Sequence, residues 1–164
     1  MRSTVRRASL ALIVGATGCG IIQGSSKPVT HLDPKSAEKR YQWTASLVTP
    51  SNLAGAMQVR GTARWSPASG DSATSVAAVN IANATPGGVH PWYVRRGQCG
   101  ENGAIVGDAA AYKPLKVGDD GAASGTARLN MPLPDSGAYY VNVHASAANL
   151  GTIISCGNLA PPVK

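Results

Sequence analysis

From residue 41 onward, apolar and polar side chains alternate along much of the chain with a period of two residues. The first such stretch spans 41–47 and the second spans 57–65. Because successive side chains on a β-strand point to opposite faces, this pattern predicts strands with one buried and one exposed face. Further short strands are predicted at residues 77–81, 89–96, 104–106, 123–131, 138–145 and 150–156.

Turn-forming residues separate the predicted strands at intervals of about eight to twelve residues. Clusters of Pro, Gly, Asn, Asp and Ser occupy 49–52, 66–71, 83–88 and 132–137, and residues 107–122 have a loop-like composition. No helical period follows the N-terminal segment. We therefore predict an all-β domain of about seven to eight strands, arranged as an antiparallel Greek-key β-sandwich or flattened barrel.

The N-terminal 40 residues follow a different pattern. Basic residues come first, an apolar stretch spans 10–18, and Cys19 follows three small residues. This order is typical of an export signal, and residues 16–19 resemble a bacterial lipobox. Residues 20–40 are rich in Gly, Ser, Lys and Pro, as in a flexible tether. We predict a signal peptide at 1–18, a lipidated Cys19 with a tether to residue 40, and a β-sandwich domain at 41–164.

A lipid on Cys19 would attach the protein to a membrane of the bacterial cell envelope by its N-terminus only. The apolar stretch of the signal is too short to span a bilayer. Gly20 does not provide an Asp-type signal for retention in the inner membrane, so we predict the outer membrane, with the domain facing the periplasm. The alternative is ordinary cleavage after Gly18, which would give a soluble periplasmic or secreted protein.

Charge gives little indication of a nucleic-acid partner. The formal net charge is +7, and loss of three arginines with the signal leaves twelve basic and eight acidic residues, a net charge of +4. These charges are scattered and form no basic run interleaved with aromatic residues, so we predict no nucleic-acid binding. The chain has no Phe, so its three Trp and five Tyr supply the bulk of a core otherwise built from small residues.

Cys99 and Cys156 remain once Cys19 is assigned to the lipid. In an oxidising compartment they are expected to form a disulfide bond, worth about 4 kcal/mol in the loop-entropy model. The alternative is a pair of buried free thiols.

Two segments resemble the copper–zinc superoxide dismutases. Residues 87–100, GGVHPWYVRRGQCG, resemble the copper-binding strand, in which a His-x-x-His-x-His motif is followed by the first cysteine of a disulfide. Residues 140–144 and 155–157 resemble the strand with the last copper histidine and the second cysteine. The resemblance covers about residues 43–160 and implies a flattened Greek-key barrel. Residues 139–144 also resemble chordin-type (CHRD) domains.

The metal ligands depart from the pattern of that family. His144 matches a copper ligand and His90 matches the first histidine of the strand, which is structural, but Tyr93 and Arg95 match two copper-ligand histidines. Residues 100–122, where the family's long metal loop would supply zinc ligands, contain no His. A redox copper site needs several imidazoles, and an arginine would place a permanent charge beside the cation. We therefore predict no catalytic residues, no metal and no cofactor.

Strand alternation places Tyr93 and Arg95 on one face and Trp92 on the other, in the core. The resemblance implies that Tyr93 and Arg95 lie together with His144, so these three form the candidate binding cluster. His90 and Trp92 are expected to be structural.

The expected function is that of an envelope lipoprotein with a superoxide-dismutase-like domain in a non-catalytic binding or structural role. One alternative is a copper-binding protein or a residual superoxide-dismutase-type oxidoreductase, with copper held by His144 and His90. A second is a polyanion- or glycan-binding module that uses the candidate cluster. The ligand and the oligomeric state are left open.

Overall fold

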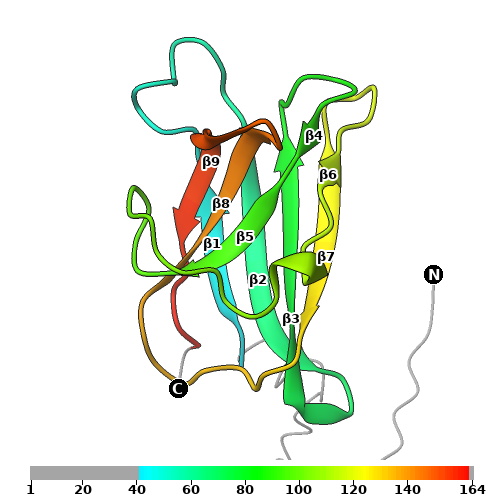
Figure 1. Cartoon of the computed structure of the whole chain (residues 1–164), viewed down its shortest axis with the longest axis vertical. Coiled ribbons are helices and arrows are strands. Elements are labelled where there is room, and N and C mark those ends of the chain that lie inside the picture. The colour runs from blue at the N-terminus through cyan, green and yellow to red at the C-terminus, as the bar shows by residue number, and fades with distance from the viewer. Residues whose placement is uncertain (1–40, 163–164) are drawn as a thin grey trace, which may run out of the picture. The chain divides into compact units, whose positions relative to one another are not determined.

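A computed structural model describes residues 41–162, so the predicted signal peptide, Cys19, the tether with His31, and residues 163–164 lie outside the described residues. The described chain is built of antiparallel strands, which confirms the all-β prediction (Figure 1). Its one helical element is the short 3-10 helix η1 (Ala109–Ala111). None of the helical structure within 41–162 is long and apolar enough to cross a membrane. The strands are β1 (Trp43–Leu47), β2 (Arg60–Ala68), β3 (Asp71–Ala82), β4 (Val89–His90), β5 (Trp92–Arg96), β6 (Leu115–Lys116), β7 (Ala123–Leu129), β8 (Tyr139–Ser146) and β9 (Asn149–Asn158).

Two sheets form a β-sandwich around one core. The first sheet has the strand order β1-β2-β3-β7 and the second has the order β5-β8-β9, while β4 and β6 form a short separate pair. All of these neighbours are antiparallel. The chain leaves the first sheet after β3, passes through the second sheet in β5, and returns to place β7 beside β3 (Figure 1).

Three buried tryptophans supply much of the bulk of the core. Trp43, Trp65 and Trp92 are at most 1 % exposed. Tyr139 packs edge-on against both Trp43 and Trp65, with ring centroids 5.3 and 5.2 Å apart. Such edge-to-face pairs are favourable beyond the area they bury. Aromatic contacts between strands of the two sheets therefore compensate for the scarcity of large aliphatic residues.

Each buried indole N–H also has a hydrogen-bond acceptor, which avoids the cost of an unpaired buried donor. The acceptors are the carbonyl oxygen of Pro134 for Trp43 (2.8 Å), the hydroxyl of Ser75 for Trp65 (2.9 Å) and the carbonyl oxygen of Lys113 for Trp92 (2.9 Å).

Backbone pairing between β1 and the C-terminal part of β9 joins the two sheets along one side. The amide of Val48 donates to the carbonyl of Cys156 (3.0 Å), and the amide of Cys156 donates back (2.9 Å). Thr44 and Ala160 exchange a second such pair of bonds. Gly157 permits this close approach, because a Cβ at that position would lie 2.2 Å from the carbonyl oxygen of Ser46.

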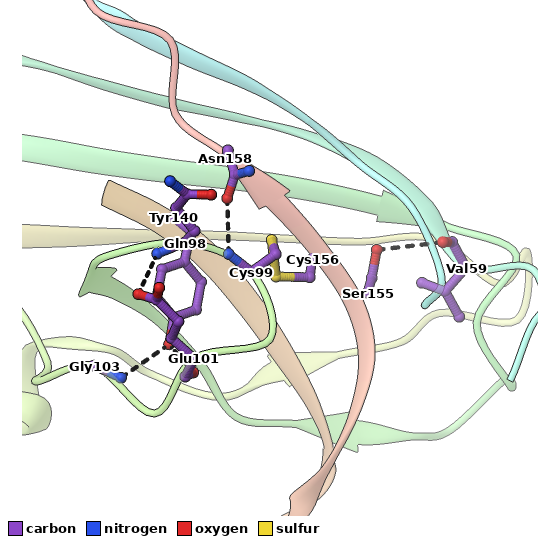
Figure 2. The surroundings of a disulfide bond; sticks show 9 residues. All are labelled: Val59, Gln98, Cys99, Glu101, Gly103, Tyr140, Ser155, Cys156 and Asn158. Carbon is purple, nitrogen blue, oxygen red and sulfur yellow. Dashed lines mark hydrogen bonds between the residues drawn. A yellow bond between two sulfur atoms is a disulfide. The ribbon is translucent and has the colours of Figure 1, made fainter. Parts of the chain in front are cut away.

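The predicted disulfide bond between Cys99 and Cys156 is confirmed. It joins residues 57 positions apart, with Cα atoms 6.0 Å apart. The backbone amide of Cys99 also donates to the side-chain oxygen of Asn158 (2.8 Å), so two interactions fasten this loop to β9 (Figure 2). In the loop-entropy model the bond stabilises the fold by about 4 kcal/mol.

Several predicted strand bounds are wrong, and prolines explain two of them. The second strand runs from Arg60 to Ala68, because Pro67 lies past Trp65, the last residue of β2 that pairs with β1. A register shift after Pro67 accommodates its missing N–H. Pro91 divides the predicted strand 89–96 into β4 and β5.

Two short segments also differ from their predicted state. Residues 104–106 do not form a strand, although Ile105 makes an isolated bridge to Arg95. The predicted loop 107–122 contains both η1 and β6, whose Leu115 is buried. A segment of two or three residues carries too little periodicity for a sequence pattern to identify.

We predict that Gly157→Ala lowers the free energy of unfolding by about 1–3 kcal/mol, because the new methyl group would push β9 away from β1. The matched control is Gly151→Ala on the same strand, where the nearest atom to the new Cβ is 3.9 Å away. Urea denaturation of both variants measures the difference. Equal stability of the two variants would contradict the close approach.

Candidate functional site

The residues of the predicted cluster lie together on the outer face of the second sheet. Tyr93 and Arg95 come from β5, and His144 comes from β8. The rings of Tyr93 and His144 have centroids 5.6 Å apart, and the guanidinium carbon of Arg95 is 5.4 Å from the Tyr93 ring centroid. Trp92 faces the opposite side and is fully buried. The arrangement is a stacked group of imidazole, phenol and guanidinium.

The chain segment 97–107, here called the disulfide loop, is bound to this face of the sheet. The hydroxyl of Tyr140 on β8 donates to the carbonyl of Glu101 and accepts from the amide of Gly103 (Figure 2). The amide of Val106 bonds to the carbonyl of Val94 on β5 (2.9 Å). Tyr140 is consequently buried, although it points away from the core between the sheets.

The charge of Arg95 is engaged with the same loop. One guanidinium nitrogen donates to the carbonyl oxygen of Gly103 at 2.7 Å, and its distance to the side-chain oxygen of Asn102 is 3.4 Å. The Nε atom of Arg95 is buried and has no hydrogen-bond partner within residues 41–162. Arg95 therefore holds the disulfide loop against β5 and leaves little of its hydrogen-bonding capacity for a ligand.

His90 lies behind the cluster, where it contacts the backbone of β8. Its Nδ1 atom is 3.1 Å from the carbonyl oxygen of His144 and 2.9 Å from that of Ala145. Since both neighbours are acceptors, we assign the proton to Nδ1. The Nε2 atom faces Gly88, where a Cβ would approach to 2.6 Å, and has no partner in the described part of the chain.

His144 is the most unusual polar residue of the domain. It is 3 % exposed, and neither ring nitrogen has a hydrogen-bond partner among residues 41–162. Burial lowers the pKa of His144, and the charge of Arg95 lowers that pKa further. The backbone of Leu150 opposes this shift, but its geometry does not complete a hydrogen bond to either nitrogen. The environment therefore favours the neutral imidazole.

The residues present do not fit a multi-imidazole copper centre. Tyr93 and Arg95 occupy two of the ligand positions that the resemblance implies, and a cation bound at His144 would lie beside the permanent charge of Arg95. Within residues 41–162 no group of three or more His, Cys, Asp or Glu side chains is placed to hold a metal ion. The free nitrogens belong to His90 and His144 alone, so the donor set is too small.

Neither protein-family models nor curated protein sequences give a match to the chain. Its function is therefore inferred from the residues and their geometry.

A second polar site lies on the outer face of the first sheet and was not predicted as a site. It is a depression of about 570 Å³. Its lining residues occupy exposed strand positions that alternation identifies only as outward-facing. Strand register is what brings them together, and register is not visible in single strands. The polar lining residues are Thr44, Ser46, Thr62, Arg64, Asn80 and Asn158.

We predict that the domain loses stability between pH 7.5 and pH 5 because of His144. Its pKa in the folded state is below the unfolded value of about 6.5, so the unfolded state binds more protons in this range. The stabilisation is complete above about pH 6.5 and is lost as the pH falls through the folded-state pKa.

Urea denaturation at several pH values, with wild type and His144→Leu, measures this effect. The leucine variant should show a flatter dependence of unfolding free energy on pH, whatever its absolute stability. The same slope in both proteins would contradict a buried neutral histidine.

Proposed function

We propose that the protein is a non-catalytic lipoprotein of the bacterial cell envelope. Its domain would be a superoxide-dismutase-like Greek-key β-sandwich without the copper and zinc ligands, with a binding or structural role. Cys19 would carry the lipid, and residues 20–40 would connect the membrane to the domain.

The order of the strands supports the superoxide-dismutase-like part of this proposal. The chain crosses from β3 to the second sheet and back to β7, as a Greek-key arrangement requires. The disulfide joins the loop after β5 to β9, as the resemblance implies. His90 bonds to the backbone at His144, which suits a structural histidine beside a former metal position.

The contacts of Arg95 are the observation that carries the non-catalytic role. The side chain at an implied copper-ligand position donates to the carbonyl of Gly103 and stacks near Tyr93. A residue in this position holds the loop closed and repels a metal cation. The same contacts account for the burial of His144 without any ligand.

The use of the cysteines supports the lipid anchor. The disulfide takes up Cys99 and Cys156, which leaves Cys19 as the remaining cysteine of the chain. Cys19 follows Ala16-Thr17-Gly18 at the end of an export signal, so its thiol is in the sequence context of lipidation.

We expect the purified, tag-free protein to contain far less than one copper or zinc ion per chain after incubation with each metal and dialysis. It should also consume superoxide no faster than His144→Ala does. Metal analysis by mass spectrometry and a superoxide assay measure these quantities, with His31→Ala as a control for adventitious imidazole binding. Near-stoichiometric copper that is lost in His144→Ala would contradict the proposal and favour the copper-binding alternative.

We expect mass spectrometry of the mature N-terminus to find Cys19 with a thioether-linked diacylglycerol, because lipoprotein processing cuts before the modified cysteine. The Cys19→Ser variant should lose this modification and no longer fractionate with membranes. An unmodified Cys19 at the mature N-terminus would instead indicate ordinary signal cleavage and remove the anchor from the proposal.

A further inference from the structure

The outer face of the first sheet carries hydroxyl and amide side chains in register across all four strands. Ser46 on β1 pairs with Thr62 on β2, which pairs with Asn80 on β3, which pairs with Ser124 on β7. All four residues are exposed. They form a continuous polar row perpendicular to the strands, in which every side chain both donates and accepts hydrogen bonds.

A cation lies beside this row. Arg64 on β2 pairs with Thr44 on β1, one step along the same face. Arg64 is exposed and forms no ion pair within residues 41–162, where the single ion pair joins Arg128 to Asp71. No acidic residue lines the depression described above. The guanidinium of Arg64 is thus an uncompensated positive charge in a polar hollow.

The far wall of the depression is formed by the end of β9 and the residues after it. Asn158 and Ala160 line it, and Ala160 is held by its backbone bonds to Thr44. The side-chain oxygen of Asn158 accepts from the amide of Cys99 (Figure 2). This bond fixes the amide group and leaves its NH₂ as a donor. The wall is consequently held in place by the disulfide loop.

A second cation extends the face along β2. Arg60 lies four residues before Arg64 on the same side of the strand, a separation of about 13 Å. Its guanidinium donates to the side chain of Gln58 (3.3 Å) and is exposed. Two positive groups separated by hydroxyl and amide side chains complement a chain of sugar units with spaced carboxylates.

From these contacts we infer that this face binds an acidic polysaccharide, specifically one built with uronic acids. A sugar carboxylate would accept two parallel hydrogen bonds from Arg64. Sugar hydroxyls would bond to Thr44, Thr62 and Asn80. The site lies on the opposite sheet from the Tyr93–Arg95–His144 cluster, so it does not depend on the fate of the metal site or on lipidation of Cys19.

Other anionic ligands fit this face less well. Single-stranded nucleic acid is bound through aromatic stacking, and none of the residues that line the depression is aromatic. Duplex nucleic acid requires many phosphate contacts, whereas only Arg64 lines the hollow. An acidic peptide usually needs apolar anchors in addition to charge, and the apolar lining here consists of Ala45, Ala63 and Ala160 alone.

The test is affinity electrophoresis of the full mature chain in gels that contain polygalacturonate, with neutral dextran gels as reference. We expect retardation by polygalacturonate only, and weaker retardation as salt is raised. Arg64→Gln should weaken binding about tenfold, as expected for loss of a charge-assisted hydrogen bond. Arg64→Lys should restore part of it, since a lysine keeps the charge but not the bidentate geometry.

The matched control is Arg96→Gln, which makes the same change of charge on an exposed residue of the other sheet. It should bind like wild type. Equal loss in Arg96→Gln and Arg64→Gln would show unspecific attraction and overturn the inference. So would absence of retardation, or equal retardation by polyglutamate, which would favour an acidic peptide. Thermal unfolding of each variant confirms that this exposed site can be changed without loss of fold.

Discussion

Residues 156–160 are bound on both sides, and most features of the domain depend on that double attachment. On one side this segment continues β9, which pairs with β8, and on the other it bonds to the backbone of β1. The first residue of the segment also forms the disulfide. Backbone bonds between neighbouring strands are obligatory for buried chain, so the two sheets cannot separate here without exposing unpaired groups. The absence of a side chain at Gly157 is the local condition for this closure.

The same closure brings distant parts of the sequence into both polar sites. Cys156 draws the disulfide loop onto the second sheet, where Arg95 and Tyr140 hold it by hydrogen bonds. Asn158, two residues later, turns its side chain to the loop and its position to the depression on the first sheet. The loop is thus attached at one end of a segment whose other end forms the wall of the second site. A change in either attachment would alter both sites through a few covalent bonds.

Much of the fold was predictable because the core follows strand alternation closely. Trp43, Trp65 and Trp92 are buried at positions that a period of two assigns to the inner face. Strand bounds failed where prolines intervene, at Pro67 and Pro91, since a missing N–H acts through the partner strand and not through the pattern itself. The two-residue strand β6 was missed for lack of any period.

The sites were predictable only where a resemblance supplied the neighbours. Alternation placed Tyr93 and Arg95 on one face, but only the resemblance connected them to His144 on another strand. For Arg64, Thr44 and Asn80 no such guide existed, and their proximity follows from pairing register, which depends on long-range contacts. The burial of His144 likewise depends on a loop whose path sequence reasoning did not establish.

The placement of the indoles has a practical consequence for spectroscopy. Trp43 and Trp65 share one aromatic group with Tyr139, whereas Trp92 packs against Tyr112, a contact 5.1 Å between ring centroids. All three are sealed from water in the native state, so their emission should be blue-shifted and should move to longer wavelength as each is wetted. Fluorescence of single-tryptophan versions would resolve whether the two aromatic groups melt together, and would give each part of the barrel its own optical reporter.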